Sequence, residues 1–133
     1  MRGISQQNVD IVQQGFLTEV ETGEPAWAII ADEVEIHDHD LIDAPHYRGF
    51  DGYRSWRENW SSTFPEFSVE PVEWIDVGER VVVILLMRAT GAGSGVTIER
   101  EDAMVLAMRD GKITRIDYYN NRQDALESVG IEE

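Results

Sequence analysis

The sequence contains no cysteine, which excludes disulfide bonds, thiolate metal ligands and a cysteine nucleophile. It also lacks any apolar run near the roughly 18 residues that a membrane-spanning helix needs, and its N-terminal stretch lacks the apolar segment of a secretory signal. We therefore expect a soluble, cytoplasmic protein with no membrane partner.

Basic residues are few, since 11 lysines and arginines stand against 26 acidic residues, for a formal net charge of −15. Such a charge repels phosphate backbones, and the basic residues form no cluster along the chain that would offset it. We therefore expect no nucleic-acid partner. The length of 133 residues and the hydrophobic content of 42% suffice for one core, so residues 1–133 are predicted to form a single domain.

Apolar residues recur at helical spacing in two long segments. Residues 5–22 carry an aliphatic stripe, and residues 51–64 carry an aromatic stripe at spacings of three, four and four. Shorter helices are predicted at 25–30, after a proline suited to a first turn, and at 122–130. The aromatic stripe consists of Tyr53, Trp56, Trp60 and Phe64.

Elsewhere the apolar period changes to two, which indicates strands. One strand is predicted from Glu33 into a histidine-rich segment, and four more follow the aromatic helix. The dipeptide Asp110-Gly111 is a strong signal for a two-residue hairpin. The order predicts an α+β fold in which helices pack on one face of an antiparallel meander. The four later strands cover residues 67–77, 80–90, 95–108 and 112–119.

The histidine-rich segment "EIHDHDLIDAPHYRG" contains every histidine of the chain, interleaved with three aspartates. It could form a metal site, an acid/base site or a solvated loop. His37 and His39 lie on one side of the predicted strand, with His46 and Asp43 nearby as further nitrogen and oxygen ligands. However, no histidine follows His46, so we expect no metal and no other cofactor.

Strand parity favours Asp38 as the working group of this segment. Val34 and Ile36 are the apolar residues of the strand, so their side should be buried, and Asp38 shares it. The histidines would then face away. A single bulge before residue 37 would reverse this assignment and turn His37 inward.

A second carboxylate, Asp102, shares the helix-facing side of its predicted strand with Met104. It could act as an acid, or it could form an ion pair with Arg100 and have no catalytic role. Tyr118, on the next strand, is the preferred candidate for an inward hydroxyl. The aromatic stripe can likewise be plain core or the wall of a ligand site.

Several segments, taken in order, resemble the SnoaL-like and ketosteroid-isomerase-like branch of the nuclear transport factor 2-like superfamily. They are "NVDIVQQGF", "VEIHD", "YRGFDGYRSW", "GSGVTIE", "RDGKITRIDYY" and "NNRQDALESVG". The resemblance implies a cone-shaped α+β barrel, with a curved antiparallel sheet and N-terminal helices on its concave face. It also implies a deep apolar pocket and a homodimer formed through the sheet. Members of this family include isomerases, polyketide cyclases, dehydratases, epoxide hydrolases and proteins that only bind.

The resemblance also assigns residues. Asp38 matches the aspartate that acts as general base in the isomerases. Their oxyanion-binding tyrosine on the first helix is replaced here by Gly15 and Phe16, so Tyr53 or Tyr118 would have to supply that donor. Relatives often have a histidine where this chain has Met104.

These observations predict a protein that binds an apolar, oxygenated small molecule. It would be either a cofactor-free isomerase, cyclase or dehydratase, or a noncatalytic binding or dimerisation module. A cavity reached by both aspartates would favour chemistry, and Asp102 held by Arg100 would favour the module. The catalytic candidates are Asp38, Asp102, Tyr118 and, with a bulge, His37. The ligand-binding candidates are Phe16, Trp27, His46, Tyr53, Trp56, Trp60 and Met104.

Overall fold

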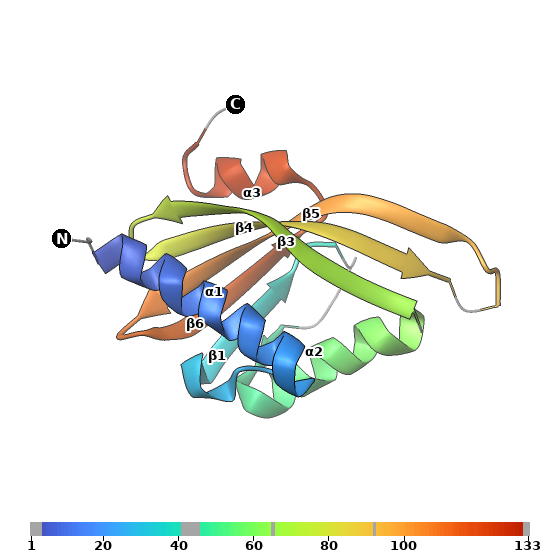
Figure 1. The fold of residues 1–133 in the computed structure, drawn as a ribbon, viewed down its shortest axis with the longest axis horizontal. Helices are drawn as coiled ribbons and strands as arrows, with labels where there is room; N and C mark the ends of the chain where they lie inside the picture. Colours follow the sequence, from blue (N-terminus) through green and yellow to red (C-terminus); the bar gives the residue numbers. More distant parts are fainter. Residues whose placement is uncertain (1–3, 41–45, 65, 92, 132–133) are drawn as a thin grey trace.

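The computed structural model describes residues 4–40, 46–64, 66–91 and 93–131, in which helices lie on both faces of one curved sheet (Figure 1). The predicted metal candidate Asp43 lies outside the described residues. The helical elements are α1 (Ile4–Thr22), the 3-10 turn η1 (Trp27–Ile29), α2 (Gly49–Thr63) and α3 (Arg122–Ser128). The strands are β1 (Ile30–Asp38), β2 (Tyr47–Arg48), β3 (Glu66–Val77), β4 (Arg80–Thr90), β5 (Thr97–Arg109) and β6 (Lys112–Tyr119).

The six strands have the order β2-β1-β6-β5-β4-β3. Strands β3 to β6 form the predicted antiparallel meander, which is confirmed. The antiparallel sheet implied by the resemblance has one parallel pair, because β1 lies parallel to β6. Strands β2 and β3 are the two edges, so the curved sheet is open and does not close into a barrel.

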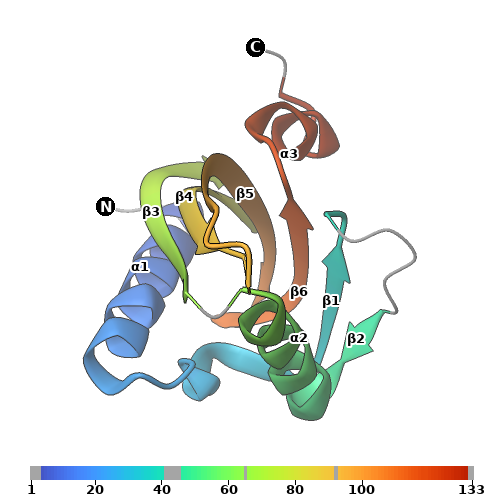
Figure 2. The ribbon, with the colours of Figure 1, turned by 90° about the vertical axis from the view of Figure 1, so that its right-hand side faces the viewer.

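The helices divide between the two faces of the sheet, as Figure 2 shows. Helices α1 and α2 lie on the concave face, as predicted, and share the larger core with residues such as Ile36 and Leu85. Helix α3 covers part of the convex face over a smaller core that contains Ile84 and Val105. The two cores follow from the period of the strands, because successive side chains enter opposite faces.

The predicted short helix at 25–30 is wrong in extent. A single 3-10 turn covers Trp27–Ile29 and buries none of its residues. Ile30 already belongs to β1, three residues before the predicted start of that strand at Glu33. Adjacent isoleucines favour extended backbone, since branching at Cβ restricts the side chain in a helix.

Two local sequence signals act as expected at the ends of elements. Asp110 and Gly111 have φ angles of 51° and 77°, so both occupy the left-handed region that a two-residue hairpin between β5 and β6 requires. Asn121 caps α3 by accepting a hydrogen bond from the Asp124 amide at 2.8 Å. None of the helices in the described residues is long and apolar enough to cross a membrane.

Candidate ligand-binding site

A cavity of about 650 Å³ lies between α1, α2 and the concave face of the sheet. Aliphatic and aromatic side chains form most of its wall. Val12 comes from α1, Leu85 from β4 and Ile116 from β6, so three separate parts of the chain enclose it. The predicted site residues that line it are Phe16, Tyr53, Trp56, Trp60, Met104 and Tyr118.

The aromatic residues of the wall pack against one another. The Trp60 ring centroid lies 5.1 Å from that of Phe67 and 5.4 Å from that of Tyr118. At the other side of the cavity, Phe16 meets Trp74 edge to face at 5.3 Å. The helical spacing of the aromatic stripe places its residues on one side of α2, so they form core and cavity wall at once.

Two predicted ligand-binding residues do not line this cavity. Trp27 packs behind the wall, edge to face with Phe50 and Tyr53 at 5.4 Å each. His46 lies beside His37, with ring centroids 4.1 Å apart, and away from the lining residues. Both assignments are corrected: Trp27 supports the wall residue Tyr53, and His46 is a neighbour of β1.

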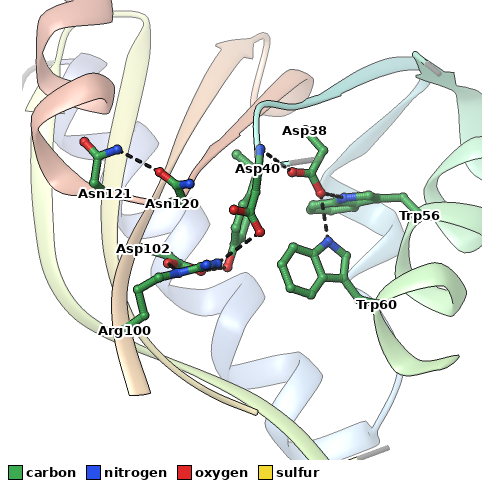
Figure 3. Close-up of polar contacts among 9 residues, drawn as sticks. Asp38, Asp40, Trp56, Trp60, Arg100, Asp102, Asn120 and Asn121 are labelled. Atoms are coloured by element: carbon green, nitrogen blue, oxygen red, sulfur yellow. Dashed lines mark hydrogen bonds and ion pairs between the residues drawn. The ribbon is translucent and has the colours of Figure 1, made fainter. Parts of the chain in front are cut away.

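Asp38 points to the buried side of β1, as its parity predicts, and is 7% exposed. The indole N–H groups of Trp56 and Trp60 donate to its Oδ2 at 2.7 and 2.8 Å, and the Asp40 amide donates to its Oδ1 at 3.0 Å (Figure 3). The aspartate lies behind the two indoles and is not among the residues that line the cavity. In this arrangement it fixes the orientation of two wall residues.

Asp102 is completely buried and is held by a cation and a phenol. Arg100 donates from Nε to Oδ1 and from Nη2 to Oδ2, the latter at 3.0 Å, and the Tyr118 hydroxyl also donates to Oδ2. The same Arg100 Nη2 reaches Asp40 Oδ2 at 3.1 Å. Asp102 therefore makes the predicted ion pair, but it also accepts a hydrogen bond from Tyr118, which lines the cavity.

The environment of Tyr118 suppresses its ionisation. Burial, followed by the charge of Asp102 and the hydrogen bond to it, raises the pKa of the phenol above its usual value. The hydrogen bond with Asp102 correspondingly raises the pKa of Arg100. Arg100 is 31% exposed, so this charged cluster extends from the cavity wall at Tyr118 to solvent.

The histidines lie on the other side of β1 and do not reach the cavity. The register with β6 is irregular between Ile30 and Glu35, yet the alternation from Val34 to Asp38 is intact, so the inward alternative for His37 is wrong.

Burial, followed by the charges of Arg115 and His46, lowers the pKa of His37. His39 instead contacts Asp117 at 2.8 Å and stacks on Tyr119. Within the described residues, no group of three or more acidic or histidine side chains could hold a metal ion.

Two charged lining residues were not identified from the sequence. Arg57, on α2, and Glu19, on α1, both line the cavity and form an ion pair with each other. Helical spacing carried the signal, because Arg57 follows Tyr53 by four positions and Glu19 follows Phe16 by three. Their charge hid it, because the apolar residues of a helix are the ones that mark its core-facing side.

An open curved sheet with two helices over an apolar cavity defines a cone-shaped α+β domain built around a small-molecule-sized site. The chain belongs to the SnoaL-like domain family, because the family model matches residues 14–116. The comparison with curated proteins gave no match.

Solved structures share the fold over nearly the whole chain. An NTF2-like protein from Burkholderia xenovorans LB400 is 25% identical, with a TM-score of 0.71 over 95% of this chain and 97% of that one. A protein named for the SnoaL-like polyketide cyclases, from Jannaschia sp. CCS1, is 16% identical, with a TM-score of 0.73 over 100% and 99%. TerC, co-crystallised with polyporic acid, is 19% identical, with a TM-score of 0.71 over 93% and 98%. The similarity to the last two proteins shows a shared fold only.

Proposed function

We propose that this protein binds an apolar small molecule carrying at least one oxygen, in the cavity between α1, α2 and the sheet. The observation that carries the proposal is the cavity of about 650 Å³ with its largely aliphatic and aromatic wall, a size typical of small-molecule sites. The indoles of Trp56 and Trp60, held in one orientation by Asp38, favour a flat ligand. The co-crystallisation of the fold neighbour TerC with polyporic acid supports ligand binding by this fold.

Tyr118 is the polar contact for the ligand in this proposal. Its hydroxyl donates to Asp102, and its oxygen keeps a lone pair that can accept a further hydrogen bond. A ligand hydroxyl can donate that bond, whereas a ketone has no proton to give. A phenol or an enol should therefore bind more tightly than an apolar molecule of the same shape.

The Tyr118 and Asp102 pair also favours a second candidate function, cofactor-free proton transfer of the kind needed by an isomerase, cyclase or dehydratase. As the proton of a ligand enol moves to the Tyr118 oxygen, the Tyr118 proton moves to Asp102 and the phenol stays neutral. Water then protonates the ligand carbon to complete a ketone, and the hydroxide left behind takes a proton from the Tyr118 hydroxyl as Asp102 returns its proton to the phenol. Asp102 is the proton acceptor here, and Asp38 is a positioning residue rather than the base.

Binding is tested by displacement of the fluorescent probe N-phenyl-1-naphthylamine. The wild type should bind this probe, and 2-naphthol should displace it more effectively than 2-methylnaphthalene does. Tyr118→Phe should remove that preference, because the variant has no oxygen to accept the bond. Tyr119→Phe is the matched control, since Tyr119 lies on the outer side and stacks on His39. Failure of the wild type to bind any of these molecules would refute the proposal.

Proton transfer is tested separately with 2-tetralone in D₂O, by the loss of its α-proton signals in NMR spectra. Wild-type protein should accelerate the exchange, and Asp102→Asn should abolish the acceleration while it still binds the naphthylamine probe. If the wild type exchanges no faster than buffer does, the binding function stands and the catalytic candidate is rejected.

The homodimer through the sheet, implied by the family resemblance, stays a prediction. We propose that the partner covers the part of the convex face that α3 leaves open, where Arg88 and Glu99 form an exposed pair at 2.7 Å. Sedimentation velocity would show a dimer in the wild type, and a monomer at all accessible concentrations would refute it.

A further inference from the structure

Charged side chains occur at one part of the cavity wall, formed by Glu19 of α1 and Arg57 of α2. Their side chains are 33% and 39% exposed. The neighbouring lining residues Leu17 and Val20 are 49% and 82% exposed. The lining residues Gln13, Gly23, Ser61, Ser68 and Val69 are exposed as well, so Glu19 and Arg57 lie on the open side of the cavity, at its mouth.

Arg57 is positioned to face a ligand as well as Glu19. Its Nη1 donates to Glu19 Oε1, and its guanidinium lies over the Tyr53 ring at 5.9 Å from the ring centroid. Glu19 and the Tyr53 side chain each take a hydrogen bond from this planar group, which carries five N–H donors in all. A guanidinium resting on an aromatic face keeps its edge available for a second carboxylate-like group.

Overall charge makes this one cation decisive for acidic ligands. The chain has 26 acidic and 11 basic residues, so its field opposes the approach of an anion. Among the lining residues in the described part of the chain, Arg57 is the one cationic side chain. An amphipathic acid can therefore bind with its apolar body in the cavity only if its anionic group reaches Arg57.

We propose that Arg57 determines ligand specificity: the cavity takes an apolar molecule that bears a carboxylate-like anion, which lies at the mouth and replaces Glu19 on the guanidinium. The inference deepens the proposed function and depends on it. Together, the two polar contacts describe a ligand with a hydroxyl at Tyr118 and an anion at Arg57. Glu19 occupies the anion position in the structure, so an incoming anion has to displace its carboxylate from Arg57.

Two fluorescent probes that differ in one group test this inference. N-phenyl-1-naphthylamine is neutral, and 1-anilinonaphthalene-8-sulfonate is the same molecule with an added sulfonate. Mutual displacement shows that both occupy one site. Arg57→Gln should weaken binding of the sulfonate roughly 5- to 10-fold and change binding of the neutral probe less than about 2-fold. Glu19→Gln should strengthen binding of the sulfonate several-fold, because it removes the competing carboxylate.

Arg54→Gln is the matched control. Arg54 lies one turn earlier on α2, over the Trp27 ring and in contact with Asp51, and it does not line the cavity. It should leave the affinity ratio of the two probes unchanged. Arg57→Lys, which keeps the charge and loses the planar fork, should give an intermediate ratio.

Three results would count against the inference. If Arg57→Gln weakens both probes equally, Arg57 supports the wall and does not select the anion. If neither Arg57→Gln nor Glu19→Gln changes the ratio of affinities, the inference fails while the binding function stands. If the wild type binds neither probe, the proposed function fails and the inference with it. Circular dichroism of each variant establishes that it is folded.

Discussion

Two buried aspartates on the concave face are stabilised by different partners. Asp38, on β1, accepts hydrogen bonds from two neutral indoles and a backbone amide. Asp102, on β5, accepts from the guanidinium of Arg100 and from the Tyr118 phenol. Two aspartates on the same face of the sheet therefore have different structural roles. Asp38 orients two wall residues, whereas Asp102 joins a wall residue to a charged cluster that reaches solvent.

We expect the largest loss of stability when Asp102, the aspartate with a charged partner, is removed. Asp102→Ala leaves Arg100 without its buried carboxylate and Tyr118 without an acceptor, so it should lower the free energy of unfolding by about 3–5 kcal/mol. Urea denaturation measures the change. Asp40→Ala removes a single contact with Arg100 and should cost less than about 1 kcal/mol. If both variants lost the same free energy of unfolding, the stronger role given to Asp102 than to Asp40 would be contradicted.

Asp38→Ala should rank second. It leaves two buried indole N–H groups without an acceptor, at a cost of about 2–3 kcal/mol in the free energy of unfolding, and it should also shift the tryptophan fluorescence. Asp38→Asn retains a carbonyl oxygen that can accept from the indoles, so it should cost about half as much. If the asparagine variant were as unstable as the alanine variant, the negative charge rather than the acceptor would hold Trp56 and Trp60.

An alkaline titration tests the Tyr118 side of the comparison. The raised pKa of Tyr118 means that the unfolded chain releases this proton first, starting near the ordinary value of 10.0, while the folded protein keeps it. Its stabilising contribution is therefore complete below about pH 10 and is lost as pH rises further. Urea denaturation between pH 8 and 11 should show a steeper decline in the wild type than in Tyr118→Phe.

Burial also raises the pKa of Tyr53, so this second tyrosine shows whether the alkaline decline comes from Tyr118. Tyr53→Phe should flatten the same curve to a smaller extent, because its pKa lacks the further rise that Asp102 gives Tyr118. Identical slopes for the wild type and Tyr118→Phe would show that the Tyr118 hydroxyl is not held by Asp102.

The smallest effect concerns His37, which neighbours Asp38 but faces the other side of β1. Its pKa is lowered below the ordinary 6.5, chiefly by burial, so the unfolded chain takes up a proton before the folded one does. Stability should therefore fall slightly as pH drops below about 6.5, and His37→Gln should reduce that slope. Differential scanning fluorimetry from pH 5 to 7 measures it. If the stability of His37→Gln has the same slope against pH, groups other than His37 cause the pH dependence.

Sequence periodicity was sufficient for most of the architecture. The stripe of Tyr53, Trp56 and Trp60 placed these residues on one side of a helix, and the parity of β1 placed Asp38 inward, because both patterns depend on local geometry. The assignment of Trp27 failed for a related reason. A few residues around it carried too little periodicity to separate a helix from a 3-10 turn followed by a strand.

Contacts between distant elements could not be predicted in this way. Nothing in the local pattern indicated that Asp38 would bind indoles 18 and 22 positions away, that Asp102 would accept a hydrogen bond from Tyr118, or that β1 would lie parallel to β6. The Glu19 and Arg57 pair joins positions 38 apart and was missed for the same reason.

The sequence by itself therefore determined most of the elements, the buried side of β1, the hairpin at Asp110-Gly111 and the resemblance to a cavity-forming family. The tertiary structure alone decided which buried polar groups meet. That difference has a physical basis, since periodicity depends on backbone geometry within one element, whereas a buried carboxylate takes whichever donors the packing of other elements brings to it. In this protein those donors are indoles for Asp38, and a guanidinium and a phenol for Asp102.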